Sequence, residues 1–592
     1  MKESHAPGTD DLHCDVAIIG GGPGGSTLAS LLAKYRPQTK IILVEREIFP
    51  RDHVGESQLP PVGEILAEMG CWDQVEAAGF PIKFGATYRW GQSTDLWDFE
   101  FIPVSAYVEE ARPRPRSGQA RQLALQVDRA VYDKILLDHV RSVGVEVLEG
   151  IAVRGIEREG DSVCCLELAD GRSIKARYYI DASGGVATLR RAMDVPVEVP
   201  TKLRNIAFWD YWENSEWASQ FAGGATRVLI LSIGIGWIWY IPIGPTRTSI
   251  GLVCNAQAYK EGERSAEELY AWALQQDPLV ADLIRNARRD GRTHATKDWS
   301  FLAERMHGEN WFLVGESGGF ADPILSAGLT LTQGGARELA HTLRELLDGS
   351  QDARWLKEQY SDIQRKRIAQ HIRFADFWYS SNGIFTDLQE QTREIARDAG
   401  MDLSPQEAFR WLATGGFTAD TPGQVGIGGL DLAGARQVVQ RLTSNEKGAW
   451  EVSRFNKYKL RLLGAATRLM PIYRNGQVER VKCYVRGNKQ LALHGFFAML
   501  VTLLKSESDL VRLLEGVSAQ AHAQGSGAQE ALFRQHALQA LEVMLNDGWV
   551  EGKQNPKRPG ITLGTPREGE RIHTNADLNA RIAGMRGPAQ AP

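Results

Sequence analysis

Three glycines and one acid near the N-terminus have the spacing of a dinucleotide-binding site. The motif Gly20-x-Gly22-x-x-Gly25 follows a β-type apolar run and leads into a segment with helical spacing, and the next apolar run, 41–44, ends at Glu45. Gly20 allows a tight turn, Gly22 lets the backbone approach a pyrophosphate, and Gly25 lets the helix pack closely on its strand. The pyrophosphate would meet free N–H groups at the helix N-terminus, and Glu45 is placed to accept from a ribose hydroxyl. The chain is therefore predicted to bind a dinucleotide.

The bulk composition is that of an ordinary globular protein. The 592 residues are 43% hydrophobic and 24% charged, enough for two or three packed units. A net charge of −5 gives no electrostatic reason to expect a nucleic-acid partner. The six cysteines form no Cys-x-x-Cys pair, and the N-terminus is polar, which predicts a cytoplasmic protein. The sequence has no apolar run of ~18 residues, so no membrane partner is expected.

The elements that must position the motif predict an α/β fold. Later apolar runs end in glycine turns at Asp181 and Glu316, as strands of one doubly wound sheet would. We expect a Rossmann-type FAD-binding domain in three segments, approximately 10–80, 120–190 and 300–350. We expect a β-sheet substrate domain to interrupt it, at approximately 81–119 and 191–299. This interruption within a module spanning 1–385 is typical of aromatic hydroxylases and favours FAD over NAD.

Residues 386–592 are predicted to form a mostly α-helical C-terminal domain. A helical segment near 540–547 precedes the basic segment 553–563, which together look like a winged-helix element. Such an element would contact DNA, but the acidic chain favours a helical lid on a catalytic domain. The tail after Asn575 is expected to be disordered.

The sequence resembles the flavin-dependent halogenases, in the phenol and pyrrole branch that includes the chloramphenicol-pathway enzyme. The resemblance covers residues 15 to about 330 and is only loose after 385. Four features carry it: the glycine fingerprint, Trp237-x-Trp239-x-Ile241-Pro242, Phe80-Pro-Ile-Lys83-Phe-Gly85 and Asp322-Pro323-x-x-Ser326-x-Gly328.

The resemblance implies a set of cofactor and halide contacts. The residues implied to bind FAD are Gly20, Gly22, Pro23, Gly25, Ser26, Glu45, Arg46, Gly55, Glu56, Ser57, Arg129, Glu316, Asp322, Pro323 and Gly328. Glu316 departs from the usual aspartate that contacts the ribityl chain. The halide is expected at Ser326, Ala327 and Gly328, because a helix N-terminus there would offer main-chain N–H groups to an anion.

The implied chemistry passes through Lys83. In this family reduced FAD, O2 and chloride or bromide give hypohalous acid, which travels along a tunnel to a lysine. That lysine either holds the acid by a hydrogen bond or becomes a chloramine, and partial burial would keep its amine form accessible. Lys83 matches the family position. Trp237, Trp239, Ile241 and Pro242 are implied to wall the tunnel, with both tryptophans on one side of a strand.

The resemblance implies a FAD-dependent halogenase, expected to be a chlorinase of an electron-rich phenol or pyrrole in antibiotic and other natural-product biosynthesis. Leu325 stands where tryptophan halogenases carry a catalytic glutamate, which argues against tryptophan as substrate. No second dinucleotide fingerprint is present, so a separate flavin reductase is expected as a partner. The substrate is free or tethered to an acyl or peptidyl carrier protein.

Three alternatives stay open. A flavin-dependent aromatic monooxygenase would lack a chloride requirement. A flavin-dependent prenyl reductase, whose relatives carry a similar aromatic-rich motif, would turn over without oxygen. A non-catalytic flavoprotein with a DNA-binding or partner-binding winged-helix end would show salt-dependent DNA affinity and unchanged function in Lys83→Ala.

Overall fold

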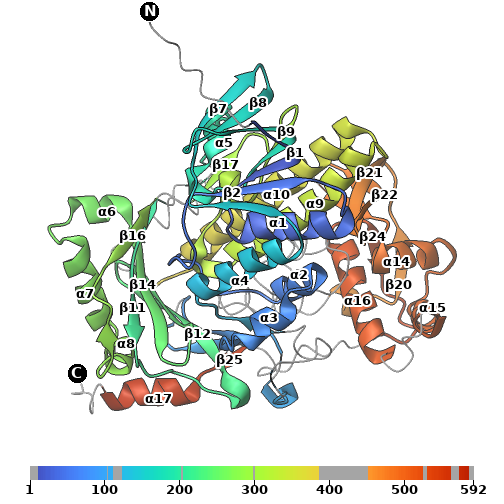
Figure 1. The fold of residues 1–592 in the computed structure, drawn as a ribbon. Coiled ribbons are helices and arrows are strands. Elements are labelled where there is room, and N and C mark those ends of the chain that lie inside the picture. The colour runs from blue at the N-terminus through green and yellow to red at the C-terminus, as the bar shows by residue number, and fades with distance from the viewer. Residues whose placement is uncertain are drawn as a thin grey trace, which may run out of the picture.

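The computed structural model describes three parts of the chain (Figure 1). These are 11–385 without 92, 103, 111, 113–122, 200, 202–203 and 298–299; 451–561 without 488 and 524–529; and 572–585. None of the helices in these parts is both long and apolar enough to cross a bilayer.

The first sheet holds the glycine motif at its centre. Its strand order is β6 (Glu146–Glu149), β2 (Ile41–Glu45), β1 (Asp11–Ile19), β9 (Ser173–Asp181), β8 (Ser162–Leu168) and β7 (Val153–Glu159), with β18 (Trp311–Leu313) also paired to β9. Strands β6, β2, β1, β9 and β18 pair in parallel. Buried parallel strands need apolar cover on both faces. Helix α1 (Pro23–Tyr35) supplies part of it and packs against α4 (Arg129–Ser142) and α9 (Gly328–Asp348).

The second sheet lies below the first in Figure 1. Its strand order is β15 (Arg288–Arg289), β11 (Asn205–Glu213), β14 (Arg247–Asn255), β13 (Gly236–Pro242), β12 (Ala225–Ile233), β3 (Ile82–Arg89), β4 (Trp97–Glu100) and β25 (Ile572–Thr574), with β16 (His294–Lys297) on β11 and β5 (Ala124–Leu125) on β3. A small sheet contains β10 (Val197–Glu198), β17 (Phe301–Ala303) and β19 (Gly319–Phe320). The two large sheets confirm the predicted α/β fold class, whereas the expected domain limits stay predictions.

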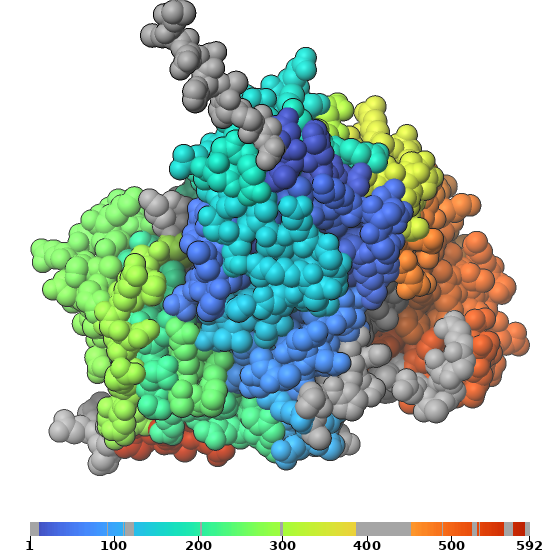
Figure 2. All heavy atoms as spheres, in the orientation of Figure 1, coloured from blue at the N-terminus to red at the C-terminus, as the bar shows by residue number. Residues whose placement is uncertain are grey.

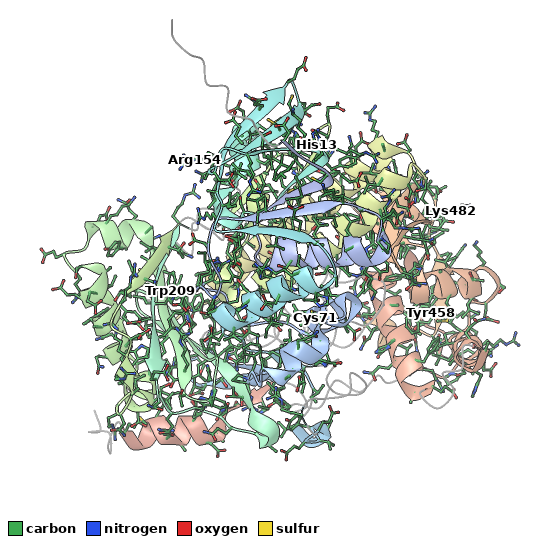
Figure 3. All side chains as sticks on the ribbon, in the orientation of Figure 1. His13, Cys71, Arg154, Trp209, Tyr458 and Lys482 are labelled. Carbon is green, nitrogen blue, oxygen red and sulfur yellow. The ribbon has the colours of Figure 1, made fainter. Side chains whose placement is uncertain are left out.

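Further helices surround the two sheets. They are α2 (Pro61–Met69), α3 (Trp72–Ala77), α5 (Thr188–Ala192), α6 (Ala256–Glu261), α7 (Ala266–Gln276), α8 (Pro278–Leu283) and α10 (Ala353–Ser380). Trp209, on β11, lies in the second sheet and away from the C-terminal residues Tyr458 and Lys482 (Figure 3). Residues of α7 and α8, including Leu274 and Leu279, share one apolar core with the outer face of the second sheet.

The C-terminal region has an apolar core of its own. Its elements are β20 (Lys457–Leu460), β21 (Ala466–Arg474), β22 (Gln477–Arg486), β23 (Lys489–Ala492), α14 (Gly495–Ser506), α15 (Leu510–Ala523), α16 (Glu530–Asn546) and β24 (Val550–Lys553). The predicted helix before the basic segment is present as α16, but β24 pairs with β20. The rest of the expected hairpin falls partly in 562–571, outside the described residues, so the winged-helix interpretation stays a prediction. Residues 386–450 also lie outside them.

The expectation of a disordered tail after Asn575 is wrong for the described residues. Strand β25 pairs with the edge strand β4, and helix α17 (Ala576–Met585) follows it. The Asn575 side chain accepts from Leu578 N at 2.9 Å, and Leu578 and Ile582 are buried in the core of the second sheet. Figure 2 shows α17, in red, lying against the green atoms of that sheet. A strand that covers an exposed sheet edge gains backbone hydrogen bonds that composition does not reveal.

Candidate functional site

The glycine turn has the shape that a bound pyrophosphate requires. Gly20 adopts φ +108°, and a Cβ there would stand 2.4 Å from the Ala182 carbonyl oxygen. A Cβ on Gly25 would stand 1.9 Å from the Gly20 oxygen, so the helix packs as closely as predicted. Gly22 is the N-cap residue of α1, which begins at Pro23, and the nearest atom to a Cβ on Gly22 would be 3.6 Å away. Of these three glycines, only Gly22 could carry a Cβ without a close contact, so its backbone is the one an anion can approach.

Glu45 closes this turn from the neighbouring strand. Its Oε2 accepts from Gly21 N at 2.6 Å and its Oε1 accepts from Glu47 N at 2.8 Å. Each oxygen keeps a lone pair for a ribose hydroxyl. Ser26 donates to the Gly21 oxygen at 2.8 Å and so braces the turn. Arg46 is largely exposed beside Glu47, and no contact among the described residues fixes its role.

Arg51 stands next to the open side of Gly22 and was missed by the sequence analysis. Its Nη2 is the atom 3.6 Å from the Gly22 Cβ position, and its Nη1 lies 3.3 Å from Asp133. Nη1 is buried without a hydrogen bond among the described residues. A guanidinium with spare donors beside a helix N-terminus suits a pyrophosphate. The cradle thus fits FAD.

The loop at 54–58 is tied to α4 by Arg129. Arg129 donates to the carbonyl oxygens of Val54 and Gly55 at 3.0 and 3.1 Å. It also pairs with Asp133 at 2.7 Å, one helical turn along. Within the loop, Glu56 accepts from Gly55 N at 2.9 Å, and burial raises the pKa of its carboxyl. Arg129 therefore fixes the loop that carries Glu56.

The Trp239 side chain reaches the same loop from the second sheet. Trp239 donates to Ser249 Oγ at 3.1 Å, and Ser249 is a neighbour of Glu56 that opposes the rise in the pKa of its carboxyl. Ile241 and Pro242 complete the buried strand β13. The structure thus places one end of the tryptophan motif beside the predicted flavin loop.

Trp237 reaches the predicted turn at 322–328 through a tyrosine. Trp237 Nε1 donates to Tyr379 Oη at 2.7 Å, and Tyr379 Oη lies 3.4 Å from Asp322 Oδ1. The rings of Trp237 and Trp239 are 6.1 Å apart, on the same face of β13. Burial raises the pKa of Asp322 to about 7. The sequence carries no spacing signal for Tyr379, which lies on α10.

The turn at 322–328 ends at the N-terminus of α9. Pro323 begins a short 3-10 helix, Ser326 adopts a left-handed φ of +55°, and Ala327 is the N-cap residue. Among the described residues no side chain caps α9, so its first N–H groups are available to an anion. A Cβ on Gly328 would stand 3.2 Å from the Phe320 ring. This geometry suits the predicted halide site.

Glu316 lies near the N-terminus of α9, as the turn at 322–328 does. It belongs to the 3-10 helix Gly315–Ser317, and burial raises the pKa of its carboxyl. A small cavity lined by Glu316, Phe320 and Gly328 adjoins it. Its predicted contact with the ribityl chain stays a prediction.

Lys83 is buried in the second sheet with a 3% exposed surface. Its Nζ donates to the Gln58 carbonyl oxygen at 3.1 Å and lies 5.6 Å from the centre of the Phe101 ring. Among the described residues no carboxylate pairs with it, and burial lowers the pKa of its ammonium to about 7. Lys83 sits on β3 and the tryptophans on β13, with β12 between them. Gln58 belongs to the loop that carries Glu56. This loop therefore connects Lys83 with the strand that carries the two tryptophans.

The fold and this constellation define a flavin-dependent halogenase. The family model "Tryptophan halogenase" matches residues 15–114 and 105–384. The chain belongs to this family, which confirms the predicted resemblance. The use of a flavin and a halide follows from the family.

Two relatives and two solved structures illustrate the similarity. A 1H-pyrrole-2-carbonyl-[peptidyl-carrier protein] chlorinase of Pseudomonas fluorescens is 30% identical over 65% of this chain and 87% of its own. A tryptophan 2-halogenase of Chondromyces crocatus is 31% identical over 58% and 64%. The myxobacterial chondrochloren halogenase CndH is 26% identical, with a TM-score of 0.56 over 73% of this chain and 97% of its own. The flavin-dependent halogenase CmlS, at 22% identity, shares the fold over 93% and 98% with a TM-score of 0.69.

Proposed function

We propose that this enzyme is a chlorinase of an electron-rich pyrrole or phenol and that Lys83 delivers the halogen. The observation that carries the proposal is the buried Lys83 amine, whose pKa is lowered to about 7. An ordinary lysine is almost fully protonated near neutral pH, whereas this one keeps a free lone pair. Such an amine can act where a surface ammonium cannot.

Reduced FAD, when bound, supplies the oxidising chemistry that turns O2 and halide into hypohalous acid. Gly22, Glu45 and Arg51 would hold its pyrophosphate and ribose, and a separate flavin reductase would provide the reduced cofactor. The N–H groups of Ala327 and Gly328 would hold the halide. Trp237 and Trp239 are buried and would exclude water between that turn and the second sheet.

Lys83 then acts in one of two ways. Its nitrogen either hydrogen-bonds to hypohalous acid or forms an N–Cl bond with loss of one water molecule. In both cases the substrate ring carbon takes Cl⁺ and loses a proton, and the amine is regenerated.

A pyrrole is supported by two observations. Leu325, which is 7% exposed, offers no carboxylate to assist a ring without its own activating heteroatom. Two relatives are named for 1H-pyrrole-2-carbonyl groups on a peptidyl carrier protein, one a chlorinase and one a brominase. A carrier-bound substrate is therefore included in the proposal beside a free one.

The test supplies purified protein with FAD, a flavin reductase, NADH, O2 and chloride. Phenols, pyrroles and indoles are assayed by mass spectrometry with Lys83→Met and the exposed control Lys260→Met. A chlorine isotope doublet present in wild type and Lys260→Met but absent in Lys83→Met supports the proposal. Oxygenated products without chlorine contradict the proposal and favour an aromatic monooxygenase. Undiminished chlorination by Lys83→Met contradicts the proposed role of Lys83.

A further inference from the structure

A buried amide without partners lies next to Lys83. Gln126 is 0% exposed, and neither its Oε1 nor its Nε2 has a hydrogen bond among the described residues. Ser57 Oγ is buried and unpartnered in the same way within the described parts of the chain. A buried polar atom left unsatisfied destabilises the fold, so native proteins rarely leave one without a ligand or water. Three such atoms at one place indicate a binding site.

The strand register puts these atoms on the same face as Lys83. In the antiparallel pair β3–β5, Lys83 lies opposite Ala124. Gln126 is two residues further and donates through its backbone N to the Pro81 oxygen at 2.9 Å, which continues the pairing. Gln126 is thus the diagonal neighbour of Lys83, within reach of long side chains. Ser57 forms an antiparallel bridge with Gln126 and faces the same side.

A carboxamide offers an acceptor and a donor side by side. The complementary substrate fragment carries one donor and one acceptor at the same spacing. A pyrrole with a carbonyl on its 2-position meets this need, because its ring N–H and the carbonyl oxygen can point the same way. A phenol hydroxyl also donates and accepts, but it does so through one atom and does not match the spacing of the two amide atoms.

We propose that Gln126 recognises a 2-acylpyrrole through two hydrogen bonds. Its Oε1 accepts from the ring N–H and its Nε2 donates to the acyl oxygen. This pairing holds the ring carbons beside Lys83 Nζ. The inference rests on the proposed function and narrows its substrate class. Gln126 is a specificity-determining residue in this reaction.

The experiment compares two probes: the N-acetylcysteamine thioester of pyrrole-2-carboxylic acid and its N-methyl analogue. Each is assayed with wild-type holoenzyme and Gln126→Met, which keeps the length of the side chain without its hydrogen bonds. Wild type is expected to prefer the N–H thioester by about 10- to 100-fold in kcat/KM, from one or two hydrogen bonds to a buried polar group. Gln126→Met is expected to lose this preference, with the change mainly in KM.

Two further readouts separate the possible failures. Chlorination of monochlorodimedone reports hypohalous acid independently of substrate recognition, and flavin content reports cofactor binding. If wild type chlorinates monochlorodimedone but treats the two thioesters alike, or turns over neither, the inference is overturned and the proposed halogenation stands. Reduced flavin content in Gln126→Met would also overturn it, since Gln126 would then contact the cofactor. If wild type chlorinates nothing, the proposed function itself fails.

Discussion

Replacing Lys83 with methionine is expected to abolish halogen transfer and to stabilise the protein. Methionine has a similar length and volume but carries no charge, so it removes the cost of keeping a lysine buried. Because burial lowers the pKa of the Lys83 ammonium from 10.5 to about 7, the folded protein gives up a proton that the unfolded chain retains. The variant has no such proton to lose.

The size of the effect follows from the pKa difference. Each pKa unit corresponds to about 1.4 kcal/mol, so at pH 8 the lost proton costs the wild type about 3 kcal/mol. The hydrogen bond from Lys83 to the Gln58 oxygen returns about 1 kcal/mol. Lys83→Met should therefore be about 2 kcal/mol more stable at pH 8. Between pH 7 and 10.5 the unfolded chain binds more protons, so wild-type stability rises with pH and the advantage falls by about 1.4 kcal/mol per pH unit.

Urea unfolding followed by tryptophan fluorescence at pH 7.5, 8.5 and 9.5 measures this advantage. Lys260→Met is the matched control, because the Lys260 side chain is exposed. Its stability difference from wild type should be small and independent of pH. A Lys83→Met variant with no gain, or with a gain that does not change with pH, would refute the reasoning and show that the Lys83 ammonium is solvated in the folded protein.

Three further predictions concern the cofactor cradle and the tail. Gly22→Ala should fold, because its methyl group meets no atom closer than 3.6 Å, but it should lose FAD, because the methyl group occupies the approach of the pyrophosphate. Gly20→Ala should also lower the melting temperature through the 2.4 Å clash with a carbonyl oxygen. Equal flavin content in Gly22→Ala and wild type would contradict this. Arg51→Gln should lower FAD affinity in a fluorescence titration, most at low salt, and an unchanged affinity would remove Arg51 from the cradle. Asp98 raises the pKa of His573, so the His573 stabilisation is present at low pH and lost as pH rises through the folded-state pKa. His573→Ala should thus destabilise more at pH 6 than at pH 8 in urea unfolding, and the opposite order would show that the imidazole binds as a neutral group.

The glycine cradle could be predicted from sequence because its geometry is local. The positive φ of Gly20 and the close packing of Gly25 both arise within one strand–turn–helix unit, and Glu45 is the end of the next strand. The contacts of Arg51 and Tyr379 could not be predicted in this way. Tyr379 meets Trp237 across 142 residues of sequence, and only the packing of α10 against the second sheet brings them together.

The structure of the C-terminal tail also depends on long-range contacts that local sequence does not reveal. Its polar composition suggests disorder, yet Asn575 donates to both carboxylate oxygens of Asp98 on β4, 477 residues earlier. Without β25 the edge of β4 would be open, and without Asn575 after it Asp98 would lose two hydrogen bonds in a buried position. The chain continues from β4 directly to Phe101, whose ring lies 5.6 Å from Lys83 Nζ. Strand β25 therefore stabilises β4, the strand that leads to the surroundings of Lys83. The predicted domain boundary near residue 385 thus separates β4 from β25, although both strands belong to the same sheet.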